Sequence, residues 1–233
     1  KRELFRQYPD VFVSANFIFG FPNETFGEIM DTFNFAKELE WDWCTFNICQ
    51  PLKGTEVWSA FQELGDDRCD EENYGKTLNP GRSAVKGEIG YHFNQDEDNV
   101  LSGRDIFDIP LESVPGSDQL REIWFTFNLV VNFLNNPNYA ADGNPAKLVK
   151  WLESIHAGYP HDASMCAALA KIYRQLGNDP KRIIYENKFQ SIVADSAYWQ
   201  RRLRQFPELL DLAGVSLPVQ TNPMPGPGHK QDE

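Results

Sequence analysis

Two apolar runs of strand length, separated by one amphipathic helix pattern, constrain the fold of this chain most. Residues 11–19 have the sequence VFVSANFIF, and residues 43–49 have the sequence WCTFNIC. Between them, Thr25 and Glu28 have the spacing of a capping box, and apolar residues recur at helical spacing as far as Leu39. Strand, helix and strand within about 40 residues predict a βαβ unit with parallel strands and a right-handed crossover.

The alternation of side chains along the first strand predicts two different faces. Ser14, Asn16 and Ile18 fall on one face, and Phe17 and Phe19 fall on the other. The smaller, mixed face suits a ligand, whereas the phenylalanine face suits a layer of helices. In β/α barrels, functional residues lie at the carboxyl ends of the strands, so we expect any site there.

The rest of the chain divides by composition into three stretches. Residues 63–115 are rich in Asp, Glu, Asn and Gly, and we expect a long irregular connection. Residues 116–214 carry helical periodicity, and residues 215–233 carry the repeated Pro and Gly of a disordered tail. With the strands in residues 1–62, the chain is expected to be an α/β unit followed by a mostly α-helical domain.

Cap signals divide this helical domain into separate helices. Ser117 is expected to cap a helix that runs to about Leu134. Asn144, which precedes Pro145, is expected to cap the next helix, and Asp162 is expected to cap a third helix that ends at Gly177. The last two helices are expected over residues 180–204 and in a short stretch after Pro207.

Charge and apolar content exclude several classes of function. The 34 acidic and 22 basic side chains give a net charge of −12, and a surface that follows phosphates would need clustered Lys and Arg. We therefore expect no nucleic-acid partner. No apolar run approaches the roughly 20 residues that span a bilayer, so we expect no membrane association and a cytoplasmic location.

The four cysteines have no metal-site spacing and form no disulfide framework. Cys44 in a strand and Cys166 in a helix are expected to be inert core thiols. Cys49, at the end of the second strand, has two interpretations: a small apolar residue, which we favour, or a reactive thiol. No two histidines have metal-ligand spacing.

Three motifs recur in order around the βαβ unit. Residues 16–24 are NFIFGFPNE, residues 32–39 are TFNFAKEL, and residues 46–55 are FNICQPLKGT. The series resembles the late barrel strands of radical S-adenosylmethionine (SAM) enzymes, where a G-x-I-x-G-like strand end continues into L-P-G-E-T and a later strand runs into P-x-P-G-T. The matching residues are Ile18, Gly20, Pro22, Glu24, Thr25, Pro51, Gly54 and Thr55. Asn16 and Asn23 depart from the pattern, because the family usually has glycine there.

The resemblance implies the C-terminal part of a radical SAM partial (β/α) barrel, followed by a mostly helical domain. It implies that Ile18 packs on the SAM adenine, that Gly20 admits its close approach, and that Pro51 forms an apolar wall. Glu24 is expected to stabilise the turn near the helix start. The implied cofactor-binding residues are Asn16, Ile18, Gly20, Pro22, Glu24, Gln50 and Pro51.

The resemblance also implies cofactors that this sequence does not supply by itself. Radical SAM enzymes hold a 4Fe-4S cluster on three cysteines, usually C-x-x-x-C-x-x-C, and no such triplet occurs here. We expect a C-terminal fragment that lacks the N-terminal barrel strands and is inactive alone. The parent enzyme would cleave SAM to a 5′-deoxyadenosyl radical, or transfer a methyl group, on an unassigned substrate. Similarity of the helical region, which includes VNFLNN, to one group of the family raises cobalamin as a second cofactor.

Two alternatives remain open at the level of sequence. Residues 160–190 resemble one tetratricopeptide unit, which would make the helical region a non-enzymatic protein-interaction module. The strands could otherwise belong to another α/β enzyme, with Ile18 as plain core and Gly20 as a plain turn. A phosphate-binding loop would be expected in such an enzyme, and the sequence shows none.

Overall fold

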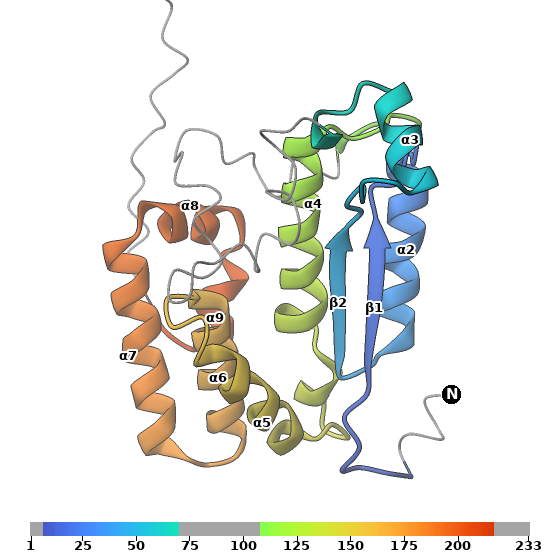
Figure 1. The fold of residues 1–233 in the computed structure, drawn as a ribbon. Coiled ribbons are helices and arrows are strands. Elements are labelled where there is room, and N and C mark those ends of the chain that lie inside the picture. The colour runs from blue at the N-terminus through green and yellow to red at the C-terminus, as the bar shows by residue number, and fades with distance from the viewer. Residues whose placement is uncertain (1–6, 70–107, 217–233) are drawn as a thin grey trace, which may run out of the picture.

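The computed structural model describes residues 7–69 and 108–216, and a parallel pair of strands lies at its centre (Figure 1). Strand β1 (Ser14–Phe19) pairs in parallel with β2 (Trp43–Ile48), and helix α2 (Phe26–Leu39) connects them. The predicted βαβ unit is therefore confirmed. The described residues form a mostly helical molecule with a two-stranded sheet, which is consistent with an α/β fold.

The predicted capping box fixes the start of α2. The backbone N–H of Glu28 donates to the Thr25 hydroxyl at 3.4 Å, and the Glu28 carboxylate accepts from the Thr25 backbone N–H at 2.8 Å. The helix ends at Glu40, which adopts a left-handed conformation with φ +47°. Both ends of the crossover are thus set by local interactions.

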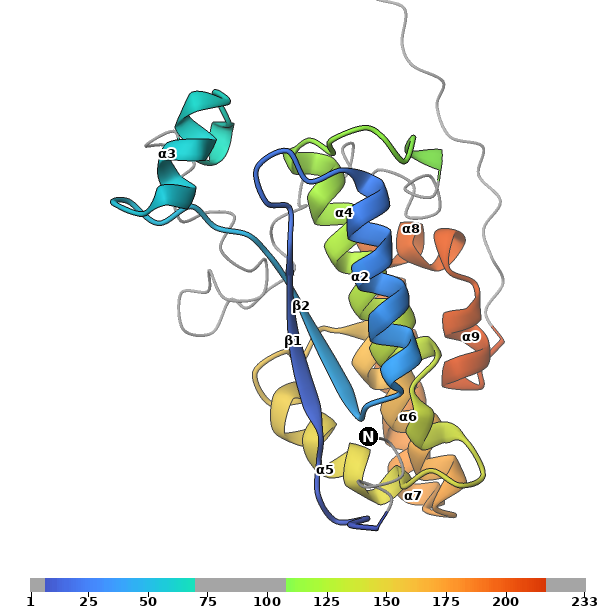
Figure 2. The same cartoon turned by 90° about the vertical axis from the view of Figure 1, so that its right-hand side faces the viewer.

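Helices α2 and α4 (Ser117–Asn128) lie side by side on one face of the sheet (Figures 1 and 2). Their apolar residues and those of the strands form one core, in which Phe19, Phe33 and Phe127 are buried. Phe33 stacks on Phe127 with ring centroids 4.2 Å apart. The predicted division into the phenylalanine face and the mixed face is confirmed, because Phe19 faces the helices and Asn16 and Ile18 remain exposed.

The edge of β2 away from β1 is covered by polar side chains of the helical region. The amide of Asn132 accepts from the backbone N–H of Cys44 at 2.8 Å and donates to its carbonyl at 2.7 Å. Trp124 Nε1 donates to the carbonyl of Phe46 at 2.7 Å, and Asn136 Nδ2 donates to that of Asp42 at 2.9 Å. These side chains satisfy backbone groups that another strand would otherwise pair.

The helical region continues from α4 through a π-helical turn and five further helices. Their bounds are η5 (Leu129–Leu134), the 3-10 turn η6 (Pro137–Tyr139), α5 (Pro145–His156), α6 (Ala163–Gln175), α7 (Asp179–Asp195), α8 (Ala197–Gln205) and α9 (Glu208–Ala213). A second core, including Trp199 and Leu152, joins these helices. A buried ion pair between Glu122 of α4 and Arg202 of α8 connects the two cores.

Two of the predicted caps in this region are confirmed and two details are wrong. Asn144 and Asp162 accept from the backbone N–H groups of Lys147 and Met165, as predicted. Gly116, not Ser117, caps α4. The single helix expected over residues 180–204 is interrupted at Ser196, whose extended backbone ends α7 and whose hydroxyl caps α8.

Helix α3 (Glu56–Glu63) and the 3-10 turn η1 (Asp67–Cys69) follow β2 at the carboxyl end of the sheet. Most of the predicted long connection lies outside the described residues, as does nearly all of the predicted tail. None of the described helices is long and apolar enough to cross a bilayer.

Candidate functional site

The two strands end side by side, which brings together the segments that carry the sequence motifs. Ile18 pairs with Asn47 in the parallel register, and the backbone N–H of Cys49 donates to the carbonyl of Phe19 at 2.7 Å. Gly20 follows β1 and Cys49 follows β2 directly. The residues predicted at the two strand ends therefore lie next to one another.

The face of the sheet away from α2 is open at its carboxyl end. Ile18 has 52% of its surface exposed, although it lies within a strand, and its neighbour Asn16 is also exposed. At the opposite, amino end this face is covered, because Trp43 is buried against Trp151 of α5. Figure 2 shows α5 and α3 on this side of the sheet, at opposite ends of the strands. An apolar side chain thus projects from an otherwise polar strand surface.

The turn after β1 has a defined conformation. Gly20 has φ +77° and Asn23 has φ +60°, so the turn uses the left-handed region twice. The Glu24 carboxylate accepts from the backbone N–H of Gly20 at 2.5 Å and from that of Phe21 at 2.9 Å. The pKa of Glu24 lies above its ordinary value, chiefly because of burial and also because of the charge of Glu28, although these hydrogen bonds lower it. The predicted structural role of Glu24 is therefore supported by its contacts.

Gly20 is required by backbone conformation and by packing. A methyl group at this position would lie 3.1 Å from both terminal carbons of Leu120 in α4. The left-handed backbone also disfavours any side chain. These contacts explain the glycine without a ligand, and its predicted role in admitting adenine remains a prediction.

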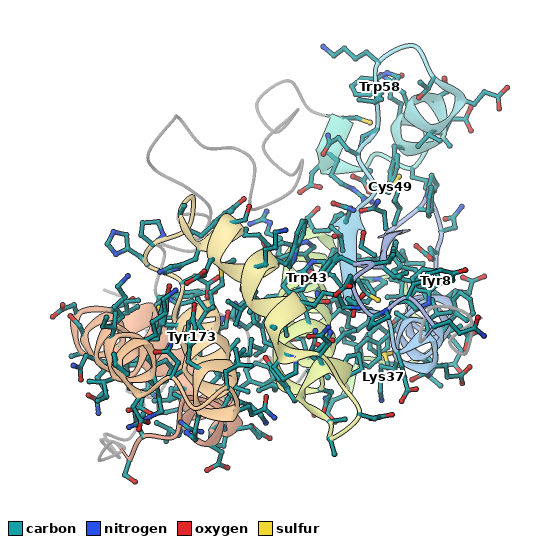
Figure 3. All side chains as sticks on the ribbon, turned by 90° about the horizontal axis from the view of Figure 1, so that it is seen from below. Tyr8, Lys37, Trp43, Cys49, Trp58 and Tyr173 are labelled. Atoms are coloured by element: carbon teal, nitrogen blue, oxygen red, sulfur yellow. The ribbon has the colours of Figure 1, made fainter. Side chains whose placement is uncertain are left out.

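Pro22, Gln50 and Pro51 are less exposed than Ile18. Pro51 is buried and Gln50 is half-buried at the end of β2, whereas Pro22 is half-buried in the turn. Their contacts with a ligand stay a prediction. Figure 3 shows Cys49 on the same side of the molecule as Trp58 of α3 and far from Tyr173 of the helical region.

Cys44, Cys49 and Cys166 are buried, whereas Cys69 is half-buried. Burial raises the pKa of Cys44 to about 11 and also raises the pKa of Cys49, on which Arg68 has a smaller, opposite effect. Both thiols are buried and protonated at neutral pH. The favoured interpretation of Cys49 as a small apolar residue agrees with this environment.

Arg68 is a residue of the site that sequence reasoning missed. Its side chain is buried, and Nη1 donates to the carbonyl of Gly20 at 2.8 Å and to the carbonyl of Cys49 at 3.2 Å. A single arginine in an acidic stretch gave no pattern that could have identified it. Its contacts with both strand ends become visible only in three dimensions.

The described residues do not fit an iron–sulfur cluster. Within residues 7–69 and 108–216, no group of three or more His, Cys, Asp or Glu side chains could hold a metal ion. The exposed Ile18 beside the defined turn offers an apolar surface with polar groups nearby, which is the kind of surface that an adenine ring requires.

Two cavities lie away from the strand ends. One, near Asp42 and Lys147, lies at the amino end of the sheet, and the other lies between α2 and α9 near Lys37 and Lys171. In the first, Lys147 Nζ lies 2.8 Å from Asp42 Oδ1, which makes a structural ion pair. Neither cavity is lined by residues of the two strand ends, so both are separate from the surface that carries Ile18.

Short segments of the chain are similar to curated proteins. Over 44 residues, 19% of this chain, it is 46% identical to an uncharacterized methyltransferase of Pyrococcus horikoshii, of which the match covers 10%. Over 55 residues, 24% of this chain, it is 33% identical to the tRNA-2-methylthio-N(6)-dimethylallyladenosine synthases of Thermotoga petrophila and Thermotoga sp., of which the match covers 12%. The matches thus span about a tenth of each relative's length.

No family model matches the chain, and no solved structure matches it significantly. The short matches support a relationship to radical SAM proteins.

Proposed function

We propose that this chain supplies part of the SAM adenine site of a radical SAM enzyme. The observation that carries the proposal is the exposed Ile18 on the open face of two parallel strands, beside a turn of defined conformation. The parent enzyme would use SAM for radical formation or for methyl transfer. Its substrate is not assigned, and the four cysteines of this chain do not have the C-x-x-x-C-x-x-C spacing that would hold the 4Fe-4S cluster.

Physical chemistry supports an adenine on this surface. Leaving 52% of the Ile18 surface exposed near the carboxyl end of β1 forgoes roughly 1 kcal/mol of burial, about half of what full burial would contribute. A flat base placed on Ile18 would recover part of that energy, and Asn16 and Asn47 lie on the same face to provide polar contacts. The residues of this chain would therefore bind and orient the base.

The names of the matched proteins are consistent with this class of chemistry. One is called an uncharacterized methyltransferase and the others are called tRNA-2-methylthio-N(6)-dimethylallyladenosine synthases. Transfer of a one-carbon or sulfur-containing group is accordingly the reaction type that we propose for the parent enzyme. The net charge of −12 gives no support for a tRNA substrate. Cobalamin as a second cofactor rests on the family resemblance alone.

We further propose that the sheet extends from the outer edge of β1. Within the described residues β1 pairs with β2 alone, and β2 has its other edge covered by Trp124 and Asn132. Next to the edge of β1, Phe35 of α2 has 55% of its surface exposed and its ring makes an edge contact with Phe17 at 6.3 Å. An additional parallel strand with its own helix would cover these groups.

A titration with adenosine tests the proposed function. We expect the backbone amide signals of Ile18, Gly20 and Gln50 to shift in two-dimensional NMR spectra of the chain. A dissociation constant of roughly millimolar order is expected, because only part of the ligand surface would be covered. Uridine should bind more weakly, and Ile18→Ser should weaken adenosine binding. Shifts confined to other parts of the chain, or equal in Ile18→Ser, would reject the proposal.

One observation favours a second candidate, the protein-interaction module. The hairpin of α6 and α7 exposes three aliphatic side chains close together in sequence, which are Leu176, Ile183 and Ile184. Exposed apolar groups of this kind are found on binding surfaces. Failure of adenosine to bind, together with binding of a helical peptide that Ile183→Glu abolishes, would favour this candidate.

A further inference from the structure

The ends of both strands are joined by one buried guanidinium group. Arg68 has only 4% of its surface exposed, and it reaches the strands from the turn η1. Its Nη1 atom donates to the carbonyl of Gly20 at 2.8 Å and to the carbonyl of Cys49 at 3.2 Å. These two carbonyls belong to the residues that directly follow β1 and β2.

The guanidinium is held in place from two further directions. Asp66 accepts from Nε at 2.8 Å and from Nη2 at 2.7 Å, which forms a bidentate pair and compensates the buried charge. The guanidinium carbon lies 4.1 Å from the centre of the Phe61 ring in α3. The group is therefore oriented by its own neighbours before any ligand arrives.

The peptide groups around Gly20 are thereby fixed on both sides. The Glu24 carboxylate accepts from the backbone N–H of Gly20, and Arg68 donates to its carbonyl. Ile18 lies two residues before Gly20, on the open face of the sheet. The position of this apolar side chain relative to the end of β2 thus depends on the guanidinium.

We propose that Arg68 is a positioning residue of the nucleoside surface, because it sets the separation of the two strand ends that carry Ile18 and Pro51. This inference rests on the proposed function. Lysine cannot replace the arginine fully, because one ammonium group lacks the planar set of five donors that serves two carbonyls and a carboxylate together.

The chain offers a matched control for this residue. Arg202 is also buried, pairs bidentately with a carboxylate, that of Glu122, and lies 3.9 Å from the centre of the Phe125 ring. It differs in location, because it connects α8 to α4 in the helical region. Arg68→Lys and Arg202→Lys therefore each replace a buried guanidinium that is paired with a carboxylate, but at two different places in the fold.

The test combines amide hydrogen exchange with adenosine binding in the full 233-residue chain. In Arg68→Lys we expect the Cys49 amide, which donates to Phe19, to exchange about ten times faster and the dissociation constant for adenosine to rise about five-fold. Arg68→Met should have larger effects on both. Arg202→Lys should leave both values within about two-fold of the unmodified chain, even where it lowers the melting temperature.

Two results would overturn the inference. One is an unchanged Cys49 exchange rate in Arg68→Lys, and the other is an equal loss of adenosine affinity in Arg202→Lys, which would show an effect of general stability. If Arg68→Met does not fold, Arg68→Lys carries the comparison. If the unmodified chain binds no adenosine, the proposed function and the nucleoside role of Arg68 both fail, and the Cys49 exchange rate still decides whether Arg68 fixes the strand ends.

Discussion

The turn between β1 and α2 depends on the carboxylate of Glu24. Replacing it by Leu keeps a side chain of similar size and removes the oxygen that accepts from Gly20 and Phe21. We expect Glu24→Leu to lower the free energy of unfolding by about 1–2 kcal/mol, measured by urea denaturation. Glu38→Leu, at an exposed position of α2, should change it by less than about 0.5 kcal/mol. Equal effects of the two substitutions would contradict this role.

Asp66 gives the site a predictable dependence on pH. Burial acts to raise its pKa, but the hydrogen bonds and charge of Arg68 outweigh burial and bring the pKa below its ordinary value. A carboxyl group of this kind stabilises the fold above the pKa of the unfolded chain, and that contribution is lost as the pH falls through the folded pKa.

We therefore expect the difference in free energy of unfolding between the unmodified chain and Asp66→Asn to be largest near neutral pH and to shrink below about pH 4. Urea denaturation at a series of pH values measures it. Asp31→Asn, at an exposed position of α2, serves as the control and should show a smaller change. A difference for Asp66→Asn that stays constant with pH would contradict the assignment.

At the scale of elements, the covered edge of β2 is held by Asn132. Its substitution by Leu would leave the buried N–H and carbonyl of Cys44 without their partners. We expect Asn132→Leu to lower the free energy of unfolding by about 2–5 kcal/mol in urea denaturation. Asn34→Leu, at an exposed position of α2, should have little effect. A small loss in Asn132→Leu would show that another group satisfies this edge.

The elements differ in how far the sequence predicts them. The βαβ unit was predictable because its signals are local: two apolar runs, the Thr25–Glu28 capping box and the glycine turn. The side chains that cover the outer edge of β2 were not predictable, because Asn132 lies 88 residues from its partner Cys44. The same holds for Arg68, whose partner Gly20 is 48 residues away. Long-range polar contacts leave no periodic pattern in a sequence.

At the scale of the whole molecule, the ion pair of Glu122 and Arg202 joins the strand-bearing core to the helical core. Both side chains are almost fully buried. We expect Arg202→Met to lower the free energy of unfolding by about 3–5 kcal/mol, because it leaves a buried carboxylate without its partner. The double substitution Arg202→Met with Glu122→Leu should recover much of the loss in the same urea denaturation. Additive losses would contradict the coupling.

The proposed barrel fragment at residues 1–62 and the proposed helical domain at residues 116–214 pack against each other. Helix α4 shares a core with the strands through Leu120, Ile123 and Phe127. Trp124 contacts both cores. The helical region thus stabilises the last strand of the sheet, which leaves the edge of β1 for the additional strands that we propose.

The central claim is that an adenine base lies on Ile18 at the open face of the strand ends. Intermolecular nuclear Overhauser effects between adenosine and the methyl groups of the chain measure this most directly. The account predicts contacts between the adenine ring protons and the Ile18 methyl groups, and none with Ile184, which is similarly exposed on α7. Contacts with Ile184 of equal strength, or no contact with Ile18 at saturating adenosine, would contradict it.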